Sequence, residues 1–133
     1  MTTLRSGVDS PSHTVLVVDD DASIRFLCRV NLELAGWIVR DAGTIPSART
    51  ILADGAIDVV LLDVHVGSEN GAEYLTEIRR EHPGLPVAML TGSAGAATFD
   101  EHAADAVIPK PFTLEQLTET VRSLAQLHAG PAG

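Results

Sequence analysis

Carboxylate side chains follow two short apolar runs of this sequence, at the points where the runs end. The run that ends at Val18 leads directly into Asp19, Asp20 and Asp21, and a second run stops at Asp63. Carboxylates that converge on one crevice repel one another, so such a cluster needs a cation or protons. Oxygen ligands with room for several waters suit Mg²⁺, which also neutralises phosphoryl oxygens. We therefore predict a Mg²⁺ site at these acidic residues.

Two further apolar runs end near residues that can stabilise negative charge. Thr91 follows the run Pro86–Leu90, and Lys110 comes after Ala106–Ile108 with a proline on either side of it. A carboxylate nucleophile, a metal ion, an ammonium and a hydroxyl are the groups needed to transfer a phosphoryl group to Asp63. The sequence contains no glycine-rich phosphate loop, so the phosphoryl group must arrive on another molecule.

Short β-branched runs alternate with helical patterns, and these elements must position the polar residues. The central run is apolar on both alternations, which is typical of a strand buried on both faces. The expected strands are Thr14–Val18, Trp37–Arg40, Asp58–Asp63, Pro86–Leu90 and Ala106–Ile108. Capping residues and periodicity predict helices that follow Asp21, Thr44, Asn70 and Thr113.

In the first of these helices, Asp21 is most simply explained as the N-cap rather than as a metal ligand. We expect Cys28 and Leu34 on the buried face of this helix, and Arg25 and Arg29 in a polar stripe.

This alternation predicts an α/β fold with a doubly wound, five-stranded parallel sheet that is covered by helices on both faces. The strand order 2-1-3-4-5 is a common solution, and it opens a crevice between the first and third strands at their carboxyl ends. Asp19, Asp20 and Asp63 would meet in that crevice, with Thr91 and Lys110 at the same edge of the sheet.

Length, charge and cysteine content limit the classes of protein. The 133 residues suffice for one domain, and we expect a disordered N-terminal tail at 1–12, the folded domain at 13–128 and a C-terminal tail at 129–133. The formal net charge of −9 opposes direct binding to nucleic acid or anionic membranes. The single cysteine fits a reducing compartment, and no apolar run is long enough for a membrane helix, so we expect a cytoplasmic protein.

Four fragments, each at a predicted strand end, resemble one known family when they are taken in this order. They are Val17-Val18-Asp19-Asp20-Asp21, Leu61-Leu62-Asp63, Pro86-Val87-Ala88-Met89-Leu90-Thr91 and Lys110-Pro111-Phe112. The chain resembles the receiver domain of bacterial two-component response regulators and is similar to the single-domain chemotaxis regulator. The resemblance covers residues 13–128 and implies a flavodoxin-like receiver fold.

The resemblance implies that Asp63 is the phosphoacceptor and takes its phosphoryl group from a histidine kinase or a histidine phosphotransfer protein. It makes Asp19 and Asp20 the acidic pair for Mg²⁺. Asp20 and Asp63 would be direct ligands, together with the backbone carbonyl of His65.

The resemblance also assigns Thr91 to a hydrogen bond with the phosphoryl oxygens and Lys110 to an ion pair with them. The peptide bond between Lys110 and Pro111 is expected to be cis.

Some positions differ from the family pattern. Val107 stands where a switch aromatic is usual, and Gly67 replaces a stiffening proline in the loop after Asp63. The interval from Thr91 to Lys110 is about one helical turn shorter than in relatives. Because the segment from Gly95 to Ala104 also has a weak helical signal, we predict a short or irregular fourth helix.

The leading functional hypothesis is a signalling module, not an enzyme with a separate substrate. It would catalyse only its own phosphorylation and slow dephosphorylation, and it would act on an unknown output protein as a monomer or weak dimer. The differences at Val107 and Gly67 favour an alternative, a receiver-like scaffold that no longer switches by phosphorylation. A remote alternative is a small phosphatase with an aspartate nucleophile, but that class needs a carboxylate at the position of His65.

Overall fold

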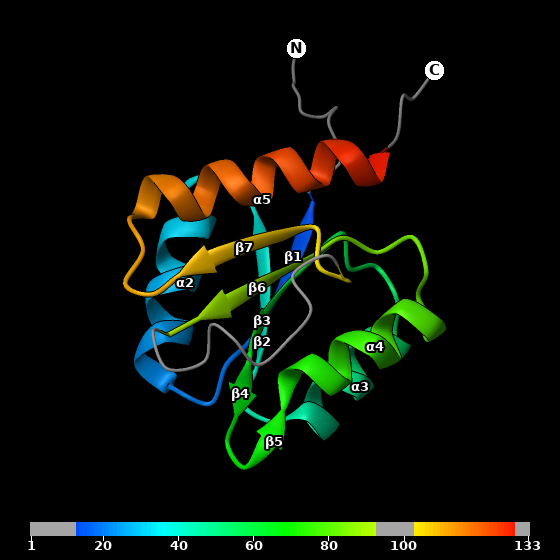
Figure 1. The fold of residues 1–133 in the computed structure, drawn as a ribbon. Helices are drawn as coiled ribbons and strands as arrows, with labels where there is room; N and C mark the ends of the chain where they lie inside the picture. Colours follow the sequence, from blue (N-terminus) through cyan, green and yellow to red (C-terminus); the bar gives the residue numbers. More distant parts are fainter. Residues whose placement is uncertain (1–12, 93–102, 130–133) are drawn as a thin grey trace.

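The computed structural model describes residues 13–92 and 103–129 (Figure 1). Along the chain, its elements are β1 (Thr14–Val18), α2 (Ala22–Leu34), β2 (Ile38–Ala42), α3 (Ile45–Ala53), β3 (Val59–Asp63), β4 (His65–Val66), β5 (Glu69–Asn70), α4 (Gly71–Glu81), β6 (Val87–Thr91), β7 (Ala106–Pro109) and α5 (Leu114–Ala129). Among these helices, none combines the length and the apolar character that crossing a membrane requires.

The main sheet has five parallel strands in the order β2-β1-β3-β6-β7. This is the predicted order 2-1-3-4-5 when the five strands are numbered along the chain, so the predicted fold class is confirmed. Val18 pairs with both Ala42 and Leu62, and Asp63 pairs with Leu90. Because β1 and β3 are in register up to their last residues, Asp19 and Asp63 emerge side by side at the carboxyl edge.

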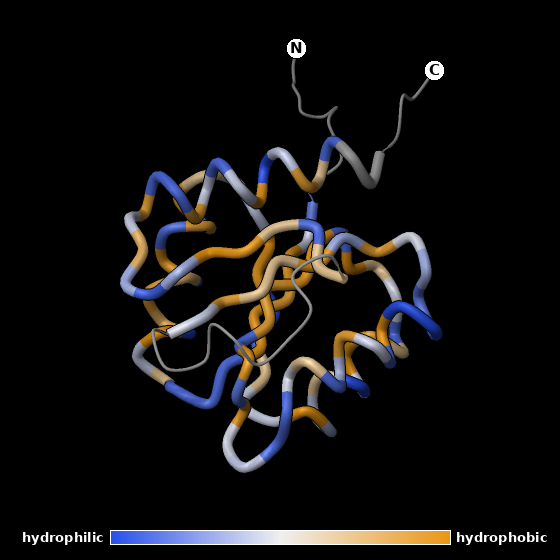
Figure 2. Tube along the Cα trace, in the orientation of Figure 1, coloured by the Kyte–Doolittle hydropathy of each residue, from blue (hydrophilic) through white to orange (hydrophobic). Residues whose placement is uncertain are grey.

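Helices α2 and α5 cover one face of the sheet, and α3 and α4 cover the other (Figure 1). Successive residues of a strand point to opposite faces, so Val15 and Val17 pack toward α2 and α5, whereas Leu16 and Val18 pack toward α3 and α4. Figure 2 shows the apolar colour concentrated along the central strands. The burial of β1 on both faces confirms that its apolar run belongs to the interior of the sheet.

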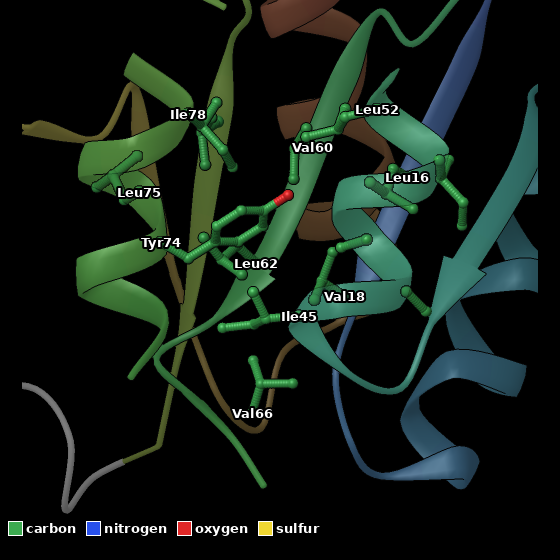
Figure 3. Packing of buried hydrophobic residues seen from close by; sticks show 14 of the residues in the cluster. Leu16, Val18, Ile45, Leu52, Val60, Leu62, Val66, Tyr74, Leu75 and Ile78 are labelled. Atoms are coloured by element: carbon green, nitrogen blue, oxygen red, sulfur yellow. The ribbon is translucent and has the colours of Figure 1, made fainter. Parts of the chain in front are cut away.

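The core on the side of α3 and α4 holds β1 and β3 against these helices (Figure 3). Its labelled side chains are Leu16, Val18, Ile45, Leu52, Val60, Leu62, Val66, Tyr74, Leu75 and Ile78. Full burial of one large aliphatic side chain contributes about 1.5–3 kcal/mol. The strands that lead to Asp19 and Asp63 are therefore firmly packed.

The predicted helix starts are confirmed by their side-chain caps. The Asp21 carboxylate accepts hydrogen bonds from the backbone amides of Ser23 and Ile24, and Thr44 and Asn70 cap α3 and α4 in the same way. At the start of α5, the Thr113 hydroxyl accepts from the Gln116 amide while the Gln116 side chain accepts from the Thr113 amide. The interpretation of Asp21 as a cap is thus confirmed.

Two local expectations were wrong. The segment after Asp63 was expected to be a loop, but β4 and β5 form a small antiparallel hairpin with Gly67 at a φ of 65° in its turn. Leu34 was expected on the buried face of α2 but is 81% exposed. Residues that recur every four positions share a helix face, so Cys28 and Leu32 lie inside and Leu34 lies outside.

The predicted short fourth helix falls mainly on residues 93–102, which lie outside the described part of the chain.

Ala56 generates a stability prediction because its φ is 69°, a left-handed value that is unfavourable for a residue with a Cβ atom. Glycine adopts this conformation without strain. We expect Ala56→Gly to raise the free energy of unfolding by up to about 1 kcal/mol in urea denaturation followed by circular dichroism. The control is Ala53→Gly in α3, which should lower that free energy because glycine disfavours helix. Equal losses in both variants would contradict the prediction.

Candidate functional site

Lys110 lies between two carboxylates at the carboxyl edge of the sheet. Its Nζ atom is 2.8 Å from Oδ2 of Asp19 and 3.5 Å from Oδ2 of Asp63. The Asp19 side chain is completely buried, and the Asp63 side chain is only 13% exposed. Buried carboxylates need compensating charge. One ammonium therefore serves two negative groups, which leaves the pair undercompensated.

The pKa of Asp63 reflects its burial and then this shortage of positive charge. Burial raises the pKa of Asp63 to about 6, and the nearby charge of Asp19 adds to the increase. Lys110 and a hydrogen bond from the His65 backbone act in the opposite direction but do not cancel it. For Lys110, burial works to lower the pKa, but the hydrogen bond and charge of Asp19 outweigh it and the pKa is raised. Lys110 therefore stays an ammonium ion at neutral pH.

Asp20 completes a group of three carboxylates. One carboxylate oxygen from each of Asp19, Asp20 and Asp63 lies within 4.8 Å of the other two. Asp19 already accepts hydrogen bonds at both oxygens, from the Asp21 amide and from Lys110. Asp20 is exposed and makes no hydrogen bond or ion pair with any described residue. Asp20 and Asp63 thus offer the oxygens with spare capacity, which suits a hard cation with bound waters.

Strands β6 and β7 bring the two remaining predicted residues to the same edge. Thr91 pairs with Pro109 in the sheet and is 5% exposed. The Lys110 amide donates to the Thr91 carbonyl at 2.6 Å, which ties the start of the lysine loop to the end of β6. The peptide bond between Lys110 and Pro111 is cis, as the resemblance implied.

His65 follows Asp63 by two residues and lies in β4 with an exposed side chain. The assignment of its carbonyl as a metal ligand stays a prediction.

Gly71, the first residue of α4, is a residue whose role was not predicted from the sequence. Its amide donates to the Val64 carbonyl at 2.6 Å, and a Cβ atom added to it would lie 2.0 Å from the carbonyl oxygen of Asp63. Only glycine lets the start of α4 come this close to the residue that carries the carboxylate. A glycine directly after the Asn70 cap was the available signal, but nothing in the sequence revealed its neighbour.

Arg25 was also missed, because its position on α2 suggested a solvated polar stripe. Its guanidinium instead contacts the backbone of Asp19 and the side chain of Asp41.

The family model of the response regulator receiver domain matches residues 15–122, which is more than half of the chain. The chain belongs to this receiver domain family. The predicted family and the flavodoxin-like receiver fold are thereby confirmed. Members of the family are signalling modules, and receiver domains of response regulators interact with histidine kinases.

Individual relatives agree with this assignment. TcrX of Mycobacterium tuberculosis, a probable transcriptional regulatory protein, is 36% identical over 121 residues, which are 87% of this chain and 51% of TcrX. The receiver domain therefore spans about half of that relative. The crystal structure of the NtrX receiver domain from Brucella abortus matches with a TM-score of 0.78 at 32% identity, over 84% of this chain and 97% of that one.

A third match is the structure of the response regulator TrrA from Thermotoga maritima in complex with Mg²⁺ and BeF. It gives a TM-score of 0.77 at 30% identity and covers 84% of this chain and 98% of TrrA.

The raised pKa of Asp63 predicts how stability depends on pH. The Asp63 carboxylate is easier to protonate in the folded protein than in the unfolded chain, where it has its usual pKa of 3.8. Its stabilising contribution is therefore complete below pH 3.8 and is lost as the pH rises through about 6. In EDTA at neutral pH, Asp63→Asn should raise the free energy of unfolding by about 1–2 kcal/mol, less than the full shift implies because some solvent contact remains. Urea denaturation at several pH values measures this difference, and a difference that does not shrink toward pH 4 would contradict the assignment.

The contact of Gly71 predicts a steric defect next to the site. Gly71→Ala should lower the free energy of unfolding by at least about 2 kcal/mol, because the start of α4 must move away from the Asp63 carbonyl. The matched control is Gly84→Ala, where an added Cβ meets no atom within 4 Å. If chemical denaturation gives the same stability for both variants, the close approach at Gly71 is unimportant.

Proposed function

We propose that this receiver domain is a phosphoacceptor in a two-component phosphorelay and that Asp63 carries the phosphoryl group. The observation that supports this most directly is the position of Lys110 within 3.5 Å of the Asp63 carboxylate and 2.8 Å of Asp19. This arrangement places a fixed positive charge where the oxygens of a group on Asp63 would gather. A carboxylate at a strand end beside a fixed cation suits phosphoryl transfer.

In the proposed reaction, an Asp63 oxygen attacks the phosphorus atom of a phosphohistidine in a histidine kinase or histidine phosphotransfer protein. The bond from phosphorus to the donor nitrogen breaks, the imidazole leaves with that electron pair, and an acyl phosphate remains on Asp63. Lys110 pairs with the new phosphoryl oxygens, and the Thr91 hydroxyl donates a hydrogen bond to one of them. Because the pKa of Asp63 is about 6, most of the nucleophile is ionised at pH 7.

Asp19, Asp20, Asp63 and the His65 carbonyl are the residues that would hold Mg²⁺, and the bound ion would offset the charge of the phosphoryl oxygens. The cluster fits this group, since all of its side-chain donors are carboxylates and Asp20 has no other partner among the described residues. Support also comes from TrrA, whose structure contains Mg²⁺ and BeF.

Exposed apolar residues on α2 suggest where a phosphoryl donor makes contact. Phe26 and Leu34 are 68% and 81% exposed, and Val30 lies between them at the same four-residue spacing. This stripe lies on the helix that begins directly after the acidic residues Asp20 and Asp21. We further propose that the domain works in the cytoplasm as a monomer or weak dimer.

The scaffold alternative keeps one observation in its favour. Val107 occupies the position expected for a switch aromatic, is 36% exposed and lines a pocket of about 440 Å³ with α5. Phosphorylation could then occur without the usual aromatic response. The phosphatase alternative lacks support, because the position that would need a carboxylate holds His65 and the chain belongs to the receiver family.

The first experiment is intact mass spectrometry after incubation with acetyl phosphate and Mg²⁺. We expect the mass of one added phosphoryl group, because a small donor needs only the residues of the site. Asp63→Asn and a sample with EDTA should show no such adduct. An adduct that persists in Asp63→Asn would place the acceptor elsewhere.

The same experiment separates the scaffold alternative. If the wild-type protein stays folded and binds Mg²⁺ but forms no adduct at times from seconds to hours, the phosphoacceptor proposal fails.

A further inference from the structure

Arg25 on α2 joins the ends of two strands beside the carboxylate cluster. Its Nη1 atom donates to the main-chain carbonyl of Asp19 at 2.7 Å, and its Nε atom donates to Oδ2 of Asp41 at 3.0 Å. Asp19 follows β1, and Asp41 is the next-to-last residue of β2. The side chain of Arg25 is 22% exposed. The guanidinium is thus a largely enclosed bridge and not a solvated surface charge.

This bridge completes the fixation of Asp19. The Asp19 amide donates to the Ala42 carbonyl at 3.1 Å, and its carboxylate oxygens accept from the Asp21 amide at 2.9 Å and from Lys110 at 2.8 Å. Arg25 donates a hydrogen bond to the one remaining polar atom of Asp19, its carbonyl oxygen. Every polar atom of Asp19 is therefore held.

The Asp19 carbonyl matters for Asp20 because the two residues share one peptide unit. A peptide unit is planar, so the direction of its carbonyl sets the direction of the following N–H and Cα. The Asp20 carboxylate has no partner of its own among the residues described. Its position in the free protein consequently depends on the backbone that Arg25 holds.

Neighbouring residues pack closely around the guanidinium of Arg25. A Cβ atom added to Gly43 would lie 2.9 Å from Nη1 of Arg25, so the connection from β2 to α3 passes directly against the guanidinium. Arg29 binds the other oxygen of Asp41 through Nη2 at 2.6 Å. Burial works to raise the pKa of Asp41, but Arg29 and then Arg25 outweigh it and hold the pKa below its usual value. Asp41 therefore remains an anion that can anchor Arg25.

We propose that Arg25 is a positioning residue that sets the Mg²⁺ affinity of the carboxylate cluster by fixing the carbonyl of Asp19 and, through it, Asp20. The inference rests on the proposed function, since it assumes that the cluster binds Mg²⁺. It adds a residue that would not touch the metal ion. Asp41 and Gly43 support Arg25, and Arg29 supplies a natural control because it binds Asp41 and Glu33 but forms no hydrogen bond with Asp19.

The test compares Arg25→Ala with Arg29→Ala in the full chain by isothermal titration with MgCl₂, at a temperature where circular dichroism shows both variants to be folded. We expect Arg25→Ala to weaken Mg²⁺ binding by about tenfold, which is the effect of losing one hydrogen bond to a charged donor. Arg29→Ala should stay within about twofold of the wild type. Arg25→Lys should recover part of the affinity, because lysine donates to one acceptor but lacks the planar fork.

A second readout needs no metal. Lys110 is the only lysine in the sequence, so selective ¹⁵N labelling of lysine gives one side-chain ammonium resonance, which reports the contact with Asp19. Arg25→Ala should shift this resonance in metal-free protein, whereas Arg29→Ala should not. If Arg25→Ala does not fold, Gly43→Ala displaces the guanidinium without removing it and should reduce the Mg²⁺ affinity severalfold.

The outcomes separate the two proposals. Equal Mg²⁺ affinities for the folded Arg25 and Arg29 variants, with an unshifted Lys110 resonance, would overturn the positioning role while leaving the phosphoacceptor function intact. A wild-type protein that binds no Mg²⁺ would overturn both proposals, and this result appears before any variant is made. Loss of stability alone, with unchanged Mg²⁺ affinity, also counts against the positioning role.

Discussion

The contact of one ammonium with one buried and one largely enclosed carboxylate is the interaction on which the rest of this structure depends. Lys110 reaches Asp19 and Asp63 at once, yet the pKa of Asp63 remains about 6, mainly because of burial and then because of Asp19. The attraction between a cation and two carboxylates is weak in water, but it is much stronger where protein encloses the charges. The fold must therefore deliver three side chains from three chain segments to one point.

A parallel sheet buried on both faces meets this requirement. Strands β1 and β3 are covered by helices on each side, so a shift of either strand would break packing in two cores at once. The pairing of Val18 with Leu62 brings the ends of β1 and β3 to the same level of the sheet. The Asp19 amide donates a hydrogen bond to the Ala42 carbonyl on β2. Lys110 directly follows a different strand, β7, and its amide donates to the Thr91 carbonyl. Backbone hydrogen bonds thus fix the carboxyl edge of the sheet, and the side chains at this edge are positioned by the backbone that carries them.

The sequence was informative where a periodic or local pattern encodes the result. Carboxylates after apolar runs located Asp19, Asp20 and Asp63, and short-range capping patterns located the starts of the helices, because both depend on neighbours along the chain. Leu34 shows the limit: α2 carries apolar residues on several faces, so hydrophobicity alone did not identify the buried one. Contacts between distant side chains and backbone, such as those of Arg25 with Asp19 and Gly71 with Asp63, leave no periodic signal. The β4–β5 hairpin was likewise not predicted, because the composition of its residues is typical of a loop.

The arrangement of charge explains why a divalent cation is the natural complement of this site. The sequence has 18 acidic residues and 9 lysines and arginines. Close to the site, Arg25 and Arg29 are both committed to Asp41. Among the residues that the structure describes, Lys110 is the one cation paired with this cluster, so three carboxylates would leave a deficit of two positive charges and a hard dication would restore neutrality. A phosphoryl group adds further negative charge at the same point, so the proposed reaction makes this demand for a cation stronger.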